Sequence, residues 1–263
     1  MTLGTATASS RRRDRPCSAL AMTILIVTVA ARAQADPPQE AAPSEGPISE
    51  TWFDRMISEN CPRAVESGKI QQRLADQRRA PPIKAVTRPA LQREVILLAE
   101  QDQDARRFAM SSNAGHSGRG VDMAHLNDVD SANLRRLKQI IRQDGFPTAR
   151  MVGYNGLQAA WLLVQHADSD PAFQAQMLPV ITRRVHRGEL DPQNYALLTD
   201  RVLLAQGKPQ RYGTQFEMQE GVLTVRALDD ASHVDQRRRA LGLIPLKDYT
   251  CILNATAEIR QSP

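Results

Sequence analysis

Helix-boundary signals recur along this chain and constrain its fold more than any other feature of the sequence. Two predicted helices begin with the same pair, Asp170-Pro171 and Asp191-Pro192, in which aspartate can cap the helix and proline can occupy its first turn. Each of these helices is expected to end at a glycine, Gly188 and Gly207 respectively. Two helices in succession are therefore predicted in this part of the chain.

Similar signals predict further helices on both sides of this pair. The expected ranges are 49–60, 68–79, 91–110, 130–143 with Asp130 as N-cap, 156–167, and 232–242 with Ser232 and Asp235 as a capping box. Strands 212–216 and 222–226 are expected to form a β-hairpin, and the glycine-rich segment 111–121 a loop. The fold class predicted is mainly α, a single helical domain with a small β-hairpin near the C-terminal third.

The N-terminus has the three parts of a secretory signal peptide. Arginines precede the apolar run 19–31, and Ala33-Gln34-Ala35 then fits the small-x-small pattern of a signal-peptidase site. The alternative is a membrane anchor, but a spanning helix needs roughly 20 apolar residues, and this run is shorter and ends at Arg32. We therefore expect residues 1–35 to be removed and the mature protein, without a membrane span, to be periplasmic or secreted.

Composition divides the rest of the chain and narrows the choice of partners. A proline-rich, acidic stretch predicts a disordered linker over 36–47, followed by a helical extension (48–90), the main helical domain (91–254) and a tail (255–263). The full chain carries 34 basic and 29 acidic residues, but five arginines and one aspartate lie in the predicted signal peptide. The remaining net charge of +1 gives no support for a nucleic-acid partner.

Two cysteines, Cys61 and Cys251, remain after the predicted cleavage, one near each end of the folded part. In an oxidising compartment a disulfide between them is the expected state. Two separate buried thiols are the alternative, and a catalytic cysteine has no recognisable activating context in the sequence.

Two strongly apolar helices carry polar residues that are expected to be buried. Asp200 and Arg201 lie in the middle of helix 192–206, whose other residues are apolar on nearly every face, and His166 follows the apolar block 159–164. Adjacent residues on a helix do not face each other, so Asp200 and Arg201 each need a partner from elsewhere in the fold. The two helices could meet at one polar centre, which would be either a structural network or a functional site.

A set of short motifs accompanies these residues. They are QHAD at 165–168, DR at 200–201, GKPQRYGTQ at 207–215 and RRRALGL at 237–243, with Asp102, Gln103 and Arg106 upstream. In this order the motifs resemble those of a bacterial domain-of-unknown-function family, and the resemblance covers roughly residues 91–249. It implies family membership without implying a reaction, a ligand or a catalytic residue.

Two functions are compatible with these residues. The first is an exported binding or interaction module with a buried polar centre, whose partner is a small ligand or an envelope protein. The alternative is a hydrolase of an envelope component with His166 as general acid or base and Asp200 beside it. The candidate ligand-binding residues are Arg201, Gln210, Tyr212, Gln215, Asp235 and Arg238. No metal site is predicted because the five histidines lack metal-ligand spacing, and the sequence indicates no cofactor.

Overall fold

The structure is a computed structural model that describes residues 50–78, 80–113 and 123–259. These residues form nine α-helices and one two-stranded hairpin, which confirms the prediction of a mainly α fold with a small hairpin. The expected signal peptide and linker lie outside the described residues, as does residue 114 onward of the expected glycine-rich loop.

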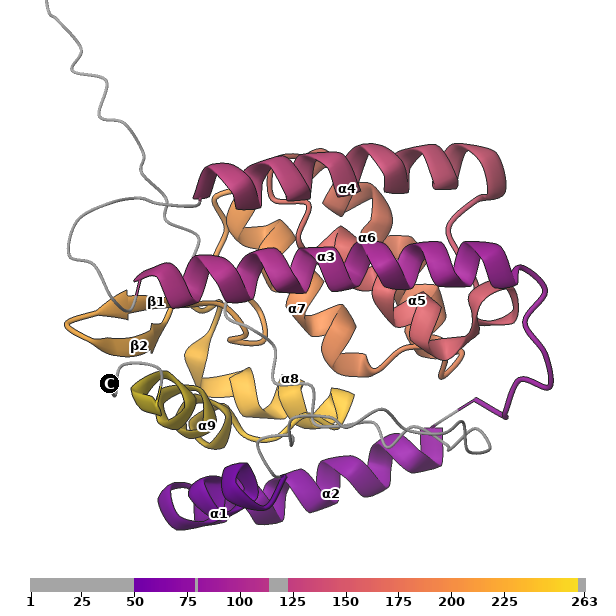
Figure 1. Ribbon diagram of the computed structural model, residues 1–263. Helices are drawn as coiled ribbons and strands as arrows, with labels where there is room; N and C mark the ends of the chain where they lie inside the picture. The colour runs from indigo at the N-terminus through magenta and orange to yellow at the C-terminus, as the bar shows by residue number, and fades with distance from the viewer. Residues whose placement is uncertain (1–49, 79, 114–122, 260–263) are drawn as a thin grey trace, which may run out of the picture.

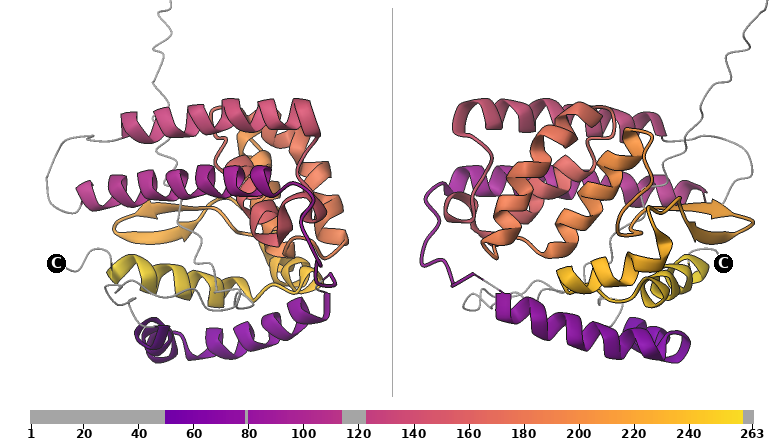
Figure 2. Two further views of the ribbon diagram at one scale, coloured as in Figure 1. Left: turned by 45° about the vertical axis from the view of Figure 1, so that its right-hand side comes forward. Right: turned by 180° about the vertical axis from the view of Figure 1, so that it is seen from behind.

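The elements pack as a helical bundle with a smaller layer beneath it (Figure 1). Their order is α1 (Glu50–Asn60), α2 (Pro62–Arg78), α3 (Pro89–Asn113), α4 (Met123–Asp144), α5 (Ala149–Gln165), α6 (Pro171–His186), α7 (Pro192–Ala205), β1 (Phe216–Gln219), β2 (Val222–Val225), α8 (Val234–Leu241) and α9 (Leu246–Ile259). Helices α3 to α7 form the bundle. Figure 2 shows α8 and α9 below it, with α1 and α2 along the outer side of that layer.

Helix α5 is the centre of the bundle because it is apolar on nearly every face. It contacts α3, α4, α6 and α7, and Val152, Leu157, Ala160, Trp161 and Val164 are at most 1% exposed. Burying one large apolar side chain contributes about 1.5–3 kcal/mol to folding. The packing of α5 therefore fixes the positions of the polar residues at its C-terminal end.

The predicted start of α5 lies too late in the sequence. The helix begins at Ala149 rather than at residue 156, and Thr148 caps it by accepting a hydrogen bond from the backbone N–H of Met151 at 3.1 Å. Gly153 then interrupts the helical geometry with a φ of 69°, a conformation that glycine adopts without steric cost. This kink separates a short first segment from the apolar segment recognised in the sequence.

The two Asp-Pro helix starts are confirmed. Asp170 accepts a hydrogen bond from Phe173 N at 3.0 Å at the start of α6, and Asp191 accepts one from Gln193 N at 2.7 Å at the start of α7. These caps are local in sequence, and a cap of this kind contributes about 1 kcal/mol.

The predicted cap at Asp130 is wrong. Helix α4 begins at Met123, and Asp130 lies inside it with its carboxylate 2.8 Å from Arg106 Nη2 instead of on a backbone N–H. Helix α3 also continues to Asn113, past its expected end at residue 110. A long-range ion pair has replaced the local interaction that the sequence pattern favoured.

The hairpin is present, but its first strand is displaced from the expected range of 212–216. Strand β1 pairs antiparallel with β2 so that Phe216 lies opposite Val225. The segment before β1 is not a strand because Asp200 accepts hydrogen bonds from its backbone N–H groups.

The predicted capping box at the start of α8 is also wrong. Ser232 donates to Asp230 Oδ1 at 2.5 Å, and the first turn of α8 has no side-chain cap. Asp235 instead accepts the backbone N–H of Leu246 at 2.7 Å, where α9 begins. The expected end at Gly242 is confirmed, with a φ of 75°.

Helix α9 was not predicted, and it continues past residue 254, where the tail was expected to begin. It contacts α1, α2, α8 and β2, so it joins the hairpin to the N-terminal helices. Asn254 binds the backbone of Leu223 in β2 through both its oxygen, at 2.8 Å, and its nitrogen, at 3.1 Å.

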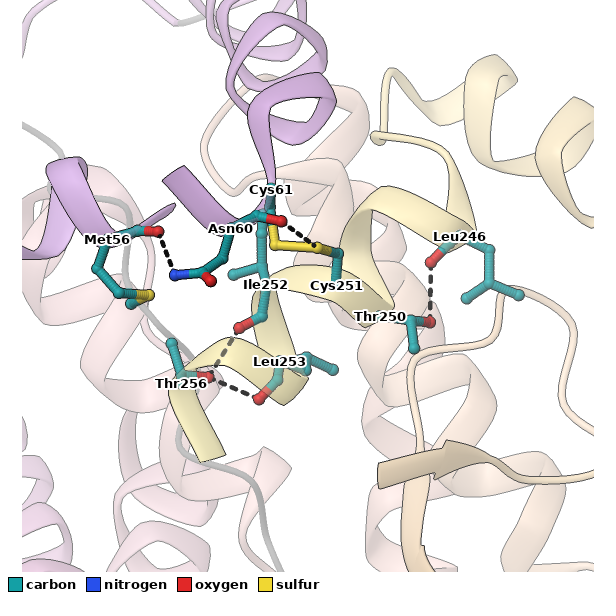
Figure 3. The surroundings of a disulfide bond; sticks show 9 residues. All are labelled: Met56, Asn60, Cys61, Leu246, Thr250, Cys251, Ile252, Leu253 and Thr256. Atoms are coloured by element: carbon teal, nitrogen blue, oxygen red, sulfur yellow. Dashed lines mark hydrogen bonds between the residues drawn. A yellow bond between two sulfur atoms is a disulfide. The ribbon is translucent and has the colours of Figure 1, made fainter. Parts of the chain in front are cut away.

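A disulfide between Cys61 and Cys251 fastens α1 and α2 to α9, which confirms the predicted pairing (Figure 3). The two Cα atoms are 6.0 Å apart, and the residues are separated by 190 positions in sequence. Ser67 Oγ adds a hydrogen bond to Asp248 Oδ2 at 2.6 Å. The N-terminal extension is therefore packed and covalently bonded onto the main domain. No helix among the described residues is long and apolar enough to cross a membrane.

Candidate functional site

Arg106 of α3 is the hub of a buried charge network. Its Nη2 lies 3.2 Å from Asp102 Oδ1 on the preceding turn and 2.8 Å from Asp130 Oδ1 on α4. The side chains of Arg106 and Asp102 are 6% and 1% exposed, whereas that of Asp130 is 18% exposed. One guanidinium therefore pairs with two carboxylates, and its pair with Asp130 links α3 to α4. Charged groups that are removed from water need such partners.

His166 joins this network from the C-cap position of α5. Its Nδ1 lies 2.7 Å from Asp102 Oδ2 and 3.0 Å from Arg106 Nε. The shorter contact favours the tautomer with the proton on Nδ1, which donates to Asp102 Oδ2, whereas in the other tautomer Nδ1 accepts the Nε–H of Arg106. Arg106 Nε–H can then donate to Asp102 Oδ2, which lies at 3.3 Å. The lone pair of the neutral imidazole is consequently on Nε2.

Burial and neighbouring charges set the ionisation of the three groups. Burial lowers the pKa of His166, the charges of Arg106 and Arg201 act in the same direction, and Asp102 opposes them. Burial disfavours ionised Asp102, but its contacts with His166 and Arg106 outweigh this and lower its pKa to about 2. Burial raises the pKa of Asp130 to about 6 despite Arg106, with a contribution from Asp102. Near neutral pH the site therefore holds charged carboxylates and a neutral imidazole.

Arg201 lies beside this network and has the partner that the sequence analysis required. Its Nη1 forms an ion pair with Asp168, just beyond the end of α5, and Asp168 also accepts a hydrogen bond from Gln174 Nε2 at 3.3 Å. The charge of Arg201 contributes to lowering the pKa of His166. The structure thus brings together His166 and Arg201 from the predicted site residues.

Asp200 has different partners from Arg201. Its Oδ1 accepts the backbone N–H groups of Arg211 at 2.7 Å and Tyr212 at 2.9 Å, and its Oδ2 accepts the N–H of Thr214 at 2.9 Å and its hydroxyl at 2.8 Å. Asp200 is 0% exposed. A buried carboxylate with this set of donors fixes the conformation of the 211–214 segment.

Three further candidates lie in or beside the same segment. Gln210 is 0% exposed and binds the backbone of Gln215 and Arg226. The Tyr212 ring packs against Tyr195 with ring centroids 5.9 Å apart. Gln215 Nε2 donates to Thr214 Oγ1 at 3.1 Å. These side chains hold the loop together.

Arg238 and Asp235 complete this second group from α8. Arg238 is 2% exposed and donates to the carbonyl oxygens of Ile244 and Tyr212, each at 2.7 Å. Its guanidinium also lies over the ring of Tyr249, 4.9 Å from the ring centroid. Asp235 binds Leu246 N, as described above. Within the described residues, no hydrogen bond or ion pair connects this group to His166.

The sequence pattern gave no site role to Asp102 or Arg106, which contact His166, and it gave Asp130, which contacts Arg106, only the role of a helix cap. The sequence of α3 contains a pattern that could have indicated the site. Its buried residues form one helical stripe, Leu91, Val95, Ala99, Ala105 and Ala109. Asp102 and Arg106 lie on that same stripe, and a charged pair on a buried face is the pattern that indicates a buried ionic site. In the described part of the chain, no three His, Cys, Asp or Glu side chains are arranged to hold a metal ion.

The fold and site define a class of mainly helical domain in which an aspartate, a histidine and an arginine form a buried network at the end of the central helix. The chain belongs to the DUF6624 family, described as a family of unknown function, whose model matches residues 89–260. This confirms the resemblance drawn from the motifs to an uncharacterised family. No curated protein and no solved structure matches the chain.

Proposed function

We propose that this protein is an exported binding module that holds a small polar ligand at His166. The proposal rests on the hydrogen bonding of the His166 imidazole. Its Nδ1–H is held by Asp102, and Nε2 has no hydrogen-bond partner among the described residues. Nε2 is also absent from the fully enclosed polar atoms that lack partners. A lone pair that is fixed in direction and has no partner among the described residues, on a side chain that is 5% exposed, supports recognition of a ligand N–H or O–H group.

Export is supported by the signal-peptide pattern together with the Cys61–Cys251 disulfide, because disulfides persist mainly in oxidising compartments. The Asp200 loop supports the binding function indirectly. Its donors and acceptors are used internally, so we assign Asp200, Gln210 and Arg238 a structural role and keep His166 and Arg201 as ligand contacts.

The test is a ligand screen on the purified exported protein with a matched histidine control. His233 forms an equivalent pair with Asp230, Nδ1 to Oδ2 at 2.6 Å, but its side chain is 59% exposed. We expect neutral sugars, amino acids or cell-wall fragments to raise the melting temperature of the wild type and of His233→Gln, but not of His166→Gln. The proposal fails if no compound acts, or if every active compound also stabilises His166→Gln.

A hydrolase is the second candidate, favoured by the Asp102–His166 contact at 2.7 Å. A carboxylate that fixes Nδ1–H leaves Nε2 poised as a general base, and such a base contributes typically 100- to 10,000-fold to a rate. Turnover of ester, amide or glycoside substrates by the wild type and by His233→Gln, with loss in both His166→Gln and Asp102→Asn, would favour this function. Saturable binding without turnover would favour the binding module.

A further inference from the structure

The outer face of α4 carries an aspartate in its first half and two arginines in its second half. Exposed side chains form this face as one stripe at helical spacing, His125, Asp128, Ala132, Arg135, Gln139 and Arg142. Helix α4 packs on α3 and α5, and Figures 1 and 2 show it at the edge of the bundle, on the side away from α1 and α2. No hydrogen bond or ion pair joins Asp128, Arg135 or Arg142 to another described residue. These charges are therefore available to a partner.

Two surface hollows lie along this face and share Ala132. The first lies between α3 and α4 and is lined by Phe108 and His125, whose ring centroids are 6.4 Å apart. Although Phe108 is apolar, it is 53% exposed. The second, which we call the arginine hollow, has a volume of about 440 Å³ and is lined by residues of α4 alone, Ala132, Arg135, Arg136, Lys138, Gln139 and Arg142. An exposed aromatic ring and a hollow lined with guanidinium groups, which attract aromatic rings, thus lie on opposite sides of Ala132.

We propose that two copies of this chain form a dimer through the outer face of α4, with the two helices antiparallel about a two-fold axis at Ala132. His125 precedes Ala132 by seven positions and Gln139 follows it by seven. The axis therefore places His125 level with the partner's Gln139, which lines the arginine hollow. Phe108, which contacts His125, then packs against the arginine hollow of the partner.

The same axis brings opposite charges together. Asp128 lies four positions before Ala132 and Arg135 lies three positions after it, so each Asp128 is level with the partner's Arg135. This pair forms twice because the interface is symmetric. A parallel arrangement of the two helices would instead place each arginine beside its own copy. Charge complementarity therefore selects the antiparallel arrangement, and the small side chain of Ala132 lets the helices approach closely at the axis.

The experiment reverses these charges in the full-length exported protein and follows its association by analytical ultracentrifugation. The wild type should show a monomer–dimer equilibrium with a dissociation constant in the micromolar range. Asp128→Arg and Arg135→Asp should each weaken the dimer about tenfold or more, because each variant places like charges opposite each other twice. An equimolar mixture of the two variants should form a heterodimer, since one chain then presents two arginines and the other two aspartates. Recovery on mixing also shows that both variants are folded.

The aromatic contact is tested by Phe108→Ser, with Ile70→Ser as the matched control. Ile70 is 50% exposed on α2, which lies across the molecule from α4 (Figure 1). Phe108→Ser should weaken the dimer about tenfold or more, because the symmetric interface loses the contact twice. Ile70→Ser should leave the dissociation constant unchanged.

The inference is overturned if the wild type is monomeric up to about 0.5 mM, if the mixed charge variants form no heterodimer, or if Phe108→Ser associates as the wild type does. Vesicle sedimentation tests a different occupant of the same face. A monomeric protein that sediments with phosphatidylglycerol vesicles but not with phosphatidylcholine vesicles, and loses this binding in Arg135→Asp, would assign the arginine hollow to an anionic lipid surface. That result would also overturn the inference.

Discussion

Replacement of Asp200 by asparagine should destabilise the protein while leaving its shape almost unchanged. Asparagine keeps one oxygen, which can still accept the N–H groups of Arg211 and Tyr212, but its NH2 group would face the N–H of Thr214. The Thr214 hydroxyl can rotate and accept from that NH2 group, so one backbone N–H is left without an acceptor. Since Thr214 is only 6% exposed, this N–H cannot be satisfied by bulk water.

The expected loss of unfolding free energy can be worked out from these contacts. A buried donor without an acceptor costs about 1–3 kcal/mol, and hydrogen bonds to a charged carboxylate are stronger than those to an amide. We expect a loss of about 3 kcal/mol for Asp200→Asn. Asp200→Ala removes the acceptor for all four donors, and we expect it to cost about 5 kcal/mol or more.

Urea unfolding followed by circular dichroism measures both losses, with Asp168→Asn as the control. Asp168 is a carboxylate that pairs with the side chain of Arg201, the residue next to Asp200, instead of with backbone N–H groups. Its side chain is 37% exposed, and we expect its replacement to cost about 1 kcal/mol or less. If Asp200→Asn unfolds within about 0.5 kcal/mol of the wild type, the assignment of Asp200 to a loop-holding role is refuted. An unchanged stability together with lost activity would return Asp200 to the catalytic candidates.

Three further predictions concern maturation, the disulfide and pH. The exported protein should begin at Asp36 or within a few residues of it, and N-terminal sequencing that finds Met1 on exported material would contradict the signal peptide. The double replacement Cys61→Ala and Cys251→Ala should lower the unfolding free energy by up to about 5 kcal/mol, because the bridge spans 190 positions. Urea unfolding measures this loss, and an unchanged unfolding free energy would show that the bridge restricts the unfolded chain little. The pKa of Asp130 is raised to about 6 from an ordinary value of 3.8, so its contribution to stability is present below pH 3.8 and is lost as the pH rises through 6. The pKa of His166 is lowered from 6.5, so its contribution is present above pH 6.5 and is lost on acidification. Asp130→Asn should therefore gain stability more steeply than the wild type between pH 4 and pH 6.5, and parallel unfolding curves across this range would count against the raised pKa.

Local signals predicted the fold well where the sequence supplies its own helix boundaries. The Asp-Pro pairs set the starts of α6 and α7 because cap and capped N–H groups lie within three residues of each other. Helix α9 lacks such a signal, and threonine and asparagine lower its intrinsic helix propensity. Its contacts with the hairpin and the N-terminal helices stabilise it, and a local pattern cannot show contacts of that kind.

The site was only partly predictable for the same reason. The sequence identified His166 and Arg201 as polar residues that must be buried and paired. It also placed His166 after the apolar block of one helix and Arg201 in the middle of another, and these two helices do contact each other. Asp130 had a competing local interpretation as a helix cap, which its pairing with Arg106 overrides. The sequence could not show that Asp200 and Arg201 point to separate groups, because that depends on where the 210–215 loop crosses α7.

The position of the disulfide has a consequence for the time course of biogenesis. Cys61 is synthesised 190 residues before Cys251, an interval of about 10–40 seconds at ordinary rates of translation. During that interval the N-terminal helices have neither their covalent partner nor α9 to pack against. Helices α1 and α2 thus depend on a later-made segment, and a molecule halted before α9 is complete would carry an unpaired thiol and an uncovered apolar surface.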